Sequence, residues 1–316
     1  MDKFAQTEDQ TKQRNGLKQS SFLAFLFLFN SVLTYASNQE FVLSRPALDS
    51  QITIKASSKF GGAIYSLMFR DKEHIDSHDH GRLLQSASFF DGLGACYNPT
   101  EGGASRESKN EEASVLKTAR VEGNQLKTTT AMAFFLGPGQ SYPGGCGSKK
   151  YLKQAVNTVE TSNHILDKRV TIGLPDFPNV IEHDVVYHVP DHFSSATFEA
   201  STGYVPKEFS GAIYYDPKQN KEIDPGDHQG EQSLPVILFT EDKHYAMGVY
   251  SPELPQKGWK VGYGRFTFPS VNKWNCVFRE SNVKPGPYQY RCLIVLGTLD
   301  EVENTVQRLD NVYGKK

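Results

Sequence analysis

Hydrophobic and polar residues alternate along much of this chain with a period of two. Residues 51–55 (Q-I-T-I-K) alternate cleanly, and Gly61-Gly62 separates them from a hydrophobic run at 63–69. Because successive side chains of a β-strand point to opposite faces, this period indicates strands with one buried face. Similar runs, separated by Gly, Pro, Asn and Asp, cover 115–121, 125–135, 155–161, 166–172, 180–189, 196–202, 212–215, 234–240, 245–250, 266–268, 273–278 and 288–296.

These runs predict an all-β fold, a large antiparallel β-sandwich (supersandwich) with a short C-terminal helix. Residues 83–90 fit either a strand or a short buried helix. Thr298 and Glu301 have the spacing of a capping box and mark the start of the C-terminal helix. After them, hydrophobic residues recur at helical spacing: Leu299, Val302, Val306 and Leu309. The glycine-rich stretch 137–147 is expected to be a loop at the rim of a site.

The N-terminal residues have the features of a targeting segment. Basic residues precede an unbroken apolar run at 22–29, and Thr34 and Ala36 offer a small-residue cleavage site. The run is far shorter than the ~20 residues that span a bilayer, so a signal peptide over 1–37 is favoured over a membrane anchor. Residues 38–316 then form a single β-sandwich domain, catalytic or carbohydrate-binding. The protein is expected to be secreted or periplasmic, without a stable membrane span after cleavage; a retained anchor is the alternative.

Four cysteines follow the proposed cleavage site, and an even number in an exported chain favours disulfides over metal binding. Cys276 and Cys292 lie in two strand-like runs joined by the turn-rich stretch 282–287, which favours a disulfide across a hairpin. Cys96 with Cys146 follows by elimination, and would tie the most polar stretch of the chain to the glycine-rich loop. Free buried thiols are the alternative.

Composition narrows the possible partners. Lys and Arg number 34 against 36 Asp and Glu, a net charge of −2, so the chain has no electrostatic signature of a protein that binds nucleic acid. Tyr and Phe far outnumber Trp, and Gly and Pro are abundant, as is typical of strands and turns. The sequence has no serine- or cysteine-nucleophile motif, phosphate-binding loop or dinucleotide fingerprint.

The stretch 74–101 is the densest in reactive side chains. His78 and His80 are two residues apart and would share one side of a strand. With His74 they make a divalent metal site conceivable, although the other ligands of such sites are missing. The alternatives are a general base or partner of sugar hydroxyls, and a solvated His-rich turn. No cofactor is expected, and metal is the minority interpretation.

Arg82 and Gln85 follow the histidines. The planar guanidinium of Arg82 suits a carboxylate such as that of a uronic acid, or an internal salt bridge to Asp79, Asp91 or Glu101. Gln85 can donate and accept at once, which suits neighbouring hydroxyls.

The motif Y-N-P-T-E-G-G at 97–103 is the sharpest in the chain. Pro99 restricts Asn98, and the two glycines allow a close backbone approach. We expect Tyr97, Asn98 and Glu101 at one rim of the site, with Tyr97 and Glu101 as proton-transfer groups and Asn98 in substrate binding. The alternative is a well-made turn whose side chains bond to the backbone.

Later groups could complete the site. Residues expected to bind substrate are His188, which alternates on a strand with His183, and a cluster with a stacking indole and two cations: Lys273, Trp274 and Arg279. Glu231 precedes a hydrophobic strand and is a candidate catalytic carboxylate. For each of them a structural role is the alternative.

One family resemblance follows from the strand G-G-x-I-x-S-L at 61–67 and the G-R step at 81–82. Both resemble the opening of galactose-mutarotase-like proteins, and the resemblance covers about the first third of the mature chain. The resemblance implies a large antiparallel supersandwich, a fold shared by aldose epimerases, sugar-binding domains of glycosidases and several polysaccharide lyases. The N-H-x-x-F-N-L-type segment with the epimerase histidine is absent, so epimerase catalysis is the less favoured implication.

The leading hypothesis is a secreted carbohydrate-active enzyme acting on a poly- or oligosaccharide. Elimination from a uronate would use Arg82 to neutralise the carboxylate, whereas hydrolysis would pair Glu101 with Glu231 across the bond. A non-catalytic carbohydrate-binding protein is the rival from another class. A structural envelope protein with a fortuitous polar patch is the third possibility. The sequence leaves the oligomeric state open.

Overall fold

A computed structural model describes residues 39–78, 82–103, 114–142 and 145–314 of the chain. All of them belong to one compact unit, Ala36–Lys316. The proposed signal peptide at 1–37 lies outside the described residues. No helix among the described residues has the length and apolar character needed to cross a membrane.

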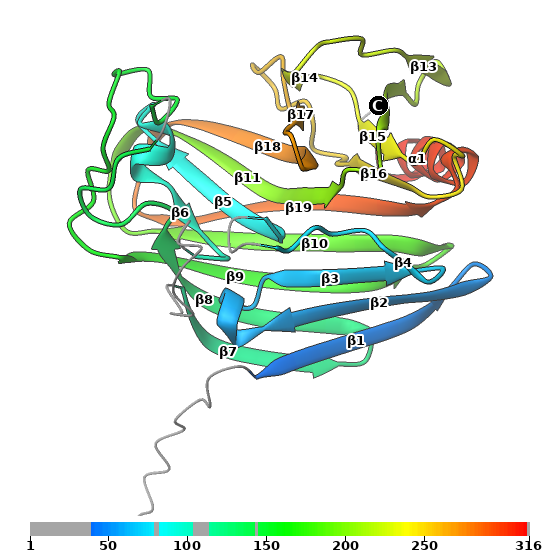
Figure 1. Ribbon diagram of the computed structural model, residues 1–316, viewed down its shortest axis with the longest axis horizontal. Helices are drawn as coiled ribbons and strands as arrows, with labels where there is room; N and C mark the ends of the chain where they lie inside the picture. The colour runs from blue at the N-terminus through cyan, green and yellow to red at the C-terminus, as the bar shows by residue number, and fades with distance from the viewer. Residues whose placement is uncertain (1–38, 79–81, 104–113, 143–144, 315–316) are drawn as a thin grey trace, which may run out of the picture. The chain divides into compact units, whose positions relative to one another are not determined.

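The strands form two antiparallel layers, which we call sheets A and B, and this confirms the predicted β-sandwich (Figure 1). Across sheet A the order is β1 (Glu40–Ala47), β2 (Ser50–Ser57), β3 (Ile64–Phe69), β5 (Leu84–Phe90), β11 (Phe193–Pro206), β18 (Val271–Val283), β17 (Tyr263–Thr267) and β14 (Gly230–Gln232), with β4 (Lys72–Glu73) also paired to β3. Across sheet B the order is β7 (Val115–Glu122), β8 (Gln125–Phe134), β9 (Thr161–Leu174), β10 (Phe177–Val189), β19 (Gly286–Gly297), β16 (Ala246–Tyr250), β15 (Val236–Phe239), β12 (Gly211–Asp216) and β13 (Lys221–Ile223). The short β6 (Pro99–Thr100) pairs with β5 and with β8 and so links the two sheets.

The main core lies between the sheets. Alternate residues of β10, such as Ile181 and Val185, face Phe198 of β11 and other apolar side chains of sheet A. Burying one such side chain is worth roughly 1.5–3 kcal/mol. Their summed contribution fixes which face of each strand points inward.

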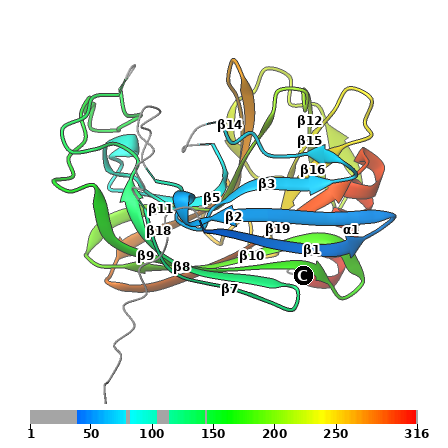
Figure 2. The ribbon, with the colours of Figure 1, turned by 60° about the horizontal axis from the view of Figure 1, so that its bottom comes forward.

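The α-helix α1 (Leu299–Tyr313) covers one end of the outer face of sheet B (Figure 2). Its capping box is present as predicted: Thr298 accepts from the Glu301 amide, and the Glu301 carboxylate accepts from the Thr298 amide at 2.7 Å. The predicted apolar stripe of α1 consists of Leu299, Val302, Val306 and Leu309. It packs on residues of β15 and β19. Arg70, from the β3–β4 turn, forms an ion pair with Glu301.

Three local predictions have clear outcomes. Residues 83–90 form strand β5 and not a helix. The described parts of the stretch 137–147, residues 137–142 and 145–147, contain no helix or named strand, as expected, whereas the strand predicted at 155–161 is absent up to Glu160. There, Ala155 instead packs in a small cluster with Leu136 and the Cys96–Cys146 disulfide, and the Asn157 amide donates to the Leu136 carbonyl. Local hydrophobicity at 155–161 therefore reflects loop packing and not strand pairing.

Both predicted disulfides are present, Cys96–Cys146 and Cys276–Cys292. The expectation that the second spans a hairpin was wrong. β18 pairs with β11 and β17, and β19 pairs with β10 and β16, so these consecutive strands lie in different sheets. The bond joins sheet A to sheet B through the core, with Cα atoms 6.5 Å apart.

Candidate functional site on the outer face of sheet A

Polar side chains from four strands, and a glycine from a fifth, occupy one transverse row on the outer face of sheet A. Gln85 of β5 lies opposite Thr202 of β11, which lies opposite Asn275 of β18. The row continues through Gly264 of β17 to Glu231 of β14. Directly opposed residues of antiparallel strands point to the same face. Leu84 and Trp274, which precede Gln85 and Asn275 in their strands, point into the core. The side chains of the row therefore point to the other, outer face.

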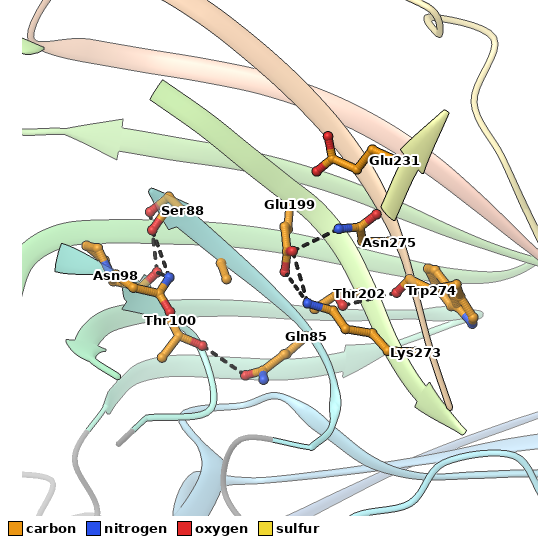
Figure 3. A network of polar contacts seen from close by, with 12 residues as sticks. Gln85, Ser88, Asn98, Thr100, Glu199, Thr202, Glu231, Lys273, Trp274 and Asn275 are labelled. Atoms are coloured by element: carbon orange, nitrogen blue, oxygen red, sulfur yellow. Dashed lines mark hydrogen bonds and ion pairs between the residues drawn. The ribbon is translucent and has the colours of Figure 1, made fainter. Parts of the chain in front are cut away.

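A β-bulge in β11 brings Glu199 onto the same face as Thr202. Glu199 pairs with Val277, while Thr202 pairs with Asn275, so β11 has one extra residue between these pairs. Both residues of the bulge turn inward: Ala200 lies in the core, and the Ser201 hydroxyl lies 3.2 Å from Nδ1 of His183. Without this insertion, residues three apart would point to opposite faces. We call Gln85, Glu199, Thr202, Glu231, Lys273 and Asn275 together the polar face (Figure 3).

Glu199 is at the centre of the hydrogen bonding on the polar face. Its carboxylate accepts from Nζ of Lys273 at 3.0 and 3.2 Å and from Nδ2 of Asn275 at 2.9 Å (Figure 3). The side chains of the ion pair are only 8% and 12% exposed. Burial lowers the pKa of Lys273, but the carboxylate more than offsets this, and the pKa is raised above its usual value. The Glu199 carboxylate thus favours the ammonium form of Lys273.

Asn275 presents an acceptor that no described residue uses. The residue is 1% exposed, and its Oδ1 has no hydrogen-bond partner among the described residues. A Cβ on Gly264 would collide with this oxygen and approach the Phe266 ring to 2.8 Å. Glycine at 264 thus leaves room for the amide and the ring together. A buried acceptor without a partner is costly, so the other contacts of Asn275 offset that cost.

Glu231 lies at the β14 end of the row and forms an ion pair with Arg279. The two side chains are 21% and 19% exposed. The Arg279 amide donates to Oε1 of Gln256 at 2.7 Å, and its Nη1 is buried without a hydrogen-bond partner among the described residues. Glu231, Lys273, Arg279 and Gln85, all candidate site residues from the sequence, thus lie on the same side of sheet A.

The Y-N-P-T-E motif does not form a rim, because it ties β5 to its neighbours. Asn98 donates to the carbonyl of Ser88 at 2.8 Å, and Thr100 donates to Oε1 of Gln85 at 3.1 Å. Glu101 is fully buried and ion-paired with Lys168 of β9, and its other oxygen accepts from the Ser86 amide at 3.1 Å. The predictions that Asn98 binds substrate and that Glu101 is a catalytic carboxylate are thereby corrected, because both side chains make structural contacts inside the protein. Burial raises the pKa of Glu101, against the opposing effect of Lys168.

Three further predicted site residues lie away from the polar face. Trp274 is fully buried, and its indole donates to the Met247 sulfur at 3.0 Å, so it offers no stacking surface (Figure 3). His188 lies on the outer face of sheet B, 2.8 Å from Asp167. Tyr97 packs among the rings of Phe90, Phe134, His164 and Phe193. Burial raises the pKa of Tyr97, which disfavours a role as general base.

Of the three histidines in the 74–80 stretch, His80 lies outside the described residues. His74 is buried against Phe209 and Tyr245, with burial lowering its pKa to about 4. His78 is exposed; Nδ1 contacts Asp76 and Nε2 contacts the Arg82 guanidinium. Within the described ranges, no group of three or more His, Cys, Asp or Glu side chains is placed to hold a metal ion.

Sequence reasoning missed Glu199 and Thr202 as site residues, and left Asn275 unassigned beside Lys273. The alternation of β18 could have indicated Asn275, because Lys273, Asn275 and Arg279 share one strand parity. Glu199 and Thr202 differ in parity, and only the bulge puts them on one face.

Comparison with known proteins adds little. No protein-family model matches the sequence, and no curated protein matches it. Solved structures with similar architecture include the Slr1438 protein from Synechocystis sp. PCC 6803, with 9% identity and a TM-score of 0.43 over 84% of this chain and 99% of that one. A heparan sulfate lyase HepC mutant from Pedobacter heparinus has 6% identity and a TM-score of 0.43, and the GH36 α-galactosidase AgaA from Geobacillus stearothermophilus has 10% and 0.44. The match covers 84% of this chain but only 37% and 42% of those two. At such values these similarities assign neither an activity nor a substrate.

Proposed function

We propose that the polar face binds an oligo- or polysaccharide and that the protein is a carbohydrate-active enzyme acting on it there. The observation that carries this proposal is the row Gln85–Thr202–Asn275–Glu231, with Glu199 and Lys273 beside it. These groups supply amide, hydroxyl, carboxylate and ammonium functions on one rigid sheet. Sugar hydroxyls both donate and accept, so they match such a mixed set. Tyr204 and Phe266 flank Lys273 and add aromatic faces for stacking.

Hydrolysis is our first candidate reaction, because two carboxylates belong to this face. A glycosidase needs a pair of carboxyl groups roughly 5–10 Å apart across the scissile bond. Glu199 and Glu231 are the candidate pair on this face, and Glu199 takes the place of Glu101, which is ion-paired with Lys168 in the interior. Elimination from a uronate is the alternative chemistry, and it yields an unsaturated product that absorbs in the ultraviolet.

A non-catalytic carbohydrate-binding protein is the second candidate, and one specific observation favours it. Both carboxylates are already ion-paired, Glu199 with Lys273 and Glu231 with Arg279. A carboxylate held by a cation is well placed to accept from a sugar hydroxyl and does not need to transfer a proton.

The test is a glycan-binding screen on the mature protein, followed by product analysis on each bound glycan. Glu199→Gln and Glu231→Gln should each reduce turnover at least 100-fold, while Glu122→Gln on β7 of sheet B should leave it unchanged. Binding without products, retained by both variants, would support the non-catalytic candidate. Absence of binding to any glycan would overturn both.

We also propose that the protein is exported and that residues 1–37 are removed. Two disulfides support this, since such bonds persist in oxidising compartments and are rare in the cytosol. N-terminal sequencing of the exported protein should find its first residue close to position 38. Accumulation of the uncleaved chain in a reducing compartment would contradict the proposal.

A further inference from the structure

A pocket of about 210 Å³ lies where α1 ends, and none of the residues that line it belongs to the polar face. It is enclosed by the end of α1, the β12–β13 turn, the segment before β15, the segment after β16 and Tyr263 of β17. Sites for drug-sized ligands measure roughly 300–1,000 Å³, so this pocket suits a ligand of only a few non-hydrogen atoms. We call it the α1 pocket.

Most of the wall of the α1 pocket is apolar. Four prolines and two leucines line it: Pro217, Pro235, Pro252, Pro255, Leu234 and Leu254. Tyr250 and Tyr263, which are 3% and 1% exposed, complete this wall. The Tyr263 hydroxyl accepts from the Ser251 amide at 2.9 Å and donates to the Ser251 carbonyl at 3.2 Å, which fixes the ring. A rigid apolar wall of this kind suits the alkyl part of a ligand.

Asp310 of α1 brings a carboxylate to the pocket. Its Oδ1 accepts from the Tyr250 hydroxyl at 3.0 Å, and burial together with the Asp310 charge raises the pKa of Tyr250, so the phenol keeps its proton. The other oxygen, Oδ2, has no hydrogen-bond or ion-pair partner among the described residues. A Cβ on Gly314 would approach Oδ1 of Asp310 to 2.7 Å. Glycine at 314 therefore keeps the space beside this carboxylate clear.

The backbone of α1 adds to the negative potential in the pocket. The carbonyl end of a helix carries a partial negative charge, which basic residues in the last turn commonly balance. The first turn of α1 has acidic residues that match the opposite, positive end, Asp300 and Glu301, but its last turn has no basic residue. Asp310 instead places a carboxylate near the negative end. This end of α1 is therefore favourable for a cation from outside the helix.

The charged side chains that line the pocket are two carboxylates and one ammonium, so the pocket has a formal charge of −1. Asp216 is the second carboxylate, and Lys218, which is exposed, forms no ion pair with it or with Asp310 among the described residues. Arg291 lies close enough to act on Tyr250 but pairs with Glu182 at 3.5 Å. The negative charge of the pocket thus has no cationic partner among the described side chains that line it.

We propose that the α1 pocket binds a small organic amine in its ammonium form. The N–H groups of the ligand donate to Oδ2 of Asp310 and to the last carbonyls of α1, as charge-assisted hydrogen bonds. Its alkyl part lies against the prolines and the two tyrosine rings, whose faces attract a cation. This inference is independent of the proposed function, since the pocket and the polar face share no residue.

The experiment is an NMR titration of the ¹⁵N-labelled mature protein with three probes: n-butylammonium, 1-butanol and tetramethylammonium. Butylammonium should bind at least tenfold tighter than 1-butanol, which has the same alkyl chain without the charge, and its affinity should fall with salt. Amide shifts are expected at Lys218, Leu254 and Gly314, which line the pocket, and not at Asp300. Tetramethylammonium has the charge but no N–H and should bind more weakly than butylammonium.

Variants locate the effect. Asp310→Asn keeps an oxygen for the Tyr250 hydroxyl and removes the charge, so it should weaken butylammonium binding about tenfold and leave 1-butanol unaffected. Asp300→Asn, at the other end of the same helix, is the matched control and should change neither. Melting curves check that each variant is folded. Asp216→Asn repeats the test at the second carboxylate and should also weaken binding.

Three results would overturn the proposal. The first is equal affinity for butylammonium and 1-butanol, and the second is butylammonium binding that neither Asp310→Asn nor Asp216→Asn weakens. The third concerns Lys315 and Lys316, which lie outside the described residues. A chain that ends at Gly314 should bind as the full chain does. Binding seen only in the shortened chain would assign the pocket to the protein's own lysines and not to a ligand.

Discussion

Each outer face of the sandwich carries a transverse row of polar side chains on neighbouring strands, but the two rows differ in how exposed their ion pairs are. On sheet B, Arg120, Lys127, Arg169 and Asp184 form one transverse row over β7, β8, β9 and β10. They line a groove of about 570 Å³. Their charges are paired, but Arg120, Lys127 and Arg169 remain between 44% and 70% exposed. On sheet A, the Glu199–Lys273 pair is about one-tenth exposed.

This difference matters because solvent screens exposed ion pairs. An exposed pair is typically worth 0–1 kcal/mol, whereas removing one partner of a buried pair costs about 3–5 kcal/mol. A protein keeps a low-exposure polar network only where many contacts fix it. The polar face is therefore the better-ordered of the two polar networks, and the face of sheet B serves as its control.

The largest expected effect concerns two neighbouring residues of β9. Lys168 is fully buried against Glu101, whereas Arg169 points to the outer face of sheet B. Lys168→Met leaves an uncompensated buried carboxylate and should lower the free energy of unfolding by about 3–5 kcal/mol. Arg169→Met should lower it by less than about 1 kcal/mol. Urea denaturation measures both, and similar losses for the two variants would contradict the contrast between interior and surface.

Acid should destabilise the protein through its buried histidines. Burial lowers the pKa of His74 and of His164 to about 4, below the ordinary value of 6.5. Between these values the unfolded state binds protons that the folded state does not, so stability is full above pH 6.5 and is lost as the pH falls toward 4. Each histidine contributes at most about 3 kcal/mol.

Unfolding free energies between pH 7 and pH 4 test this. His74→Gln should flatten the profile, whereas His188→Gln, at an exposed position on sheet B, should leave its slope unchanged. A profile as steep in His74→Gln as in the parent protein would exclude His74 as a cause.

A smaller loss is expected on the polar face itself. Lys273→Met leaves Glu199 with Asn275 as its remaining donor among the described residues. Because hydrogen bonds to charged groups are worth about 1.5–3 kcal/mol, we expect a loss of about 2 kcal/mol. Arg120→Met, with a 70% exposed side chain, is the matched control and should be near neutral. Equal changes would mean that the polar face is no better organised than the face of sheet B.

The fold was largely predictable because alternation reports burial directly. The capping box of α1 and most strands follow from local pattern, whereas the correct pairing of Cys276 with Cys292 was predicted from a hairpin that the fold does not contain. The site was less predictable. Glu101 and Trp274 look like surface groups in the sequence. Nothing local shows that Lys168, 67 positions away, forms an ion pair with Glu101, or that the Met247 sulfur accepts a hydrogen bond from the Trp274 indole. The bulge at Ala200–Ser201 also leaves no hydrophobic signature, so the parity of Glu199 could not be read.

The smallest effect is expected at Glu303 of α1, at the covered end of sheet B. Burial and the neighbouring Glu222 raise the pKa of Glu303 from 4.5 to about 7. The folded state therefore holds a proton that the unfolded state releases, so the stabilisation is complete below pH 4.5 and is lost as the pH rises through 7. This trend is opposite in sign to that of the buried histidines, and solvent screening keeps it below about 1 kcal/mol. Glu303→Gln should remove the decline between pH 5 and pH 8 in melting temperature. An unchanged decline would show that the two carboxylates do not share a proton, and that α1 is held to β13 by other contacts.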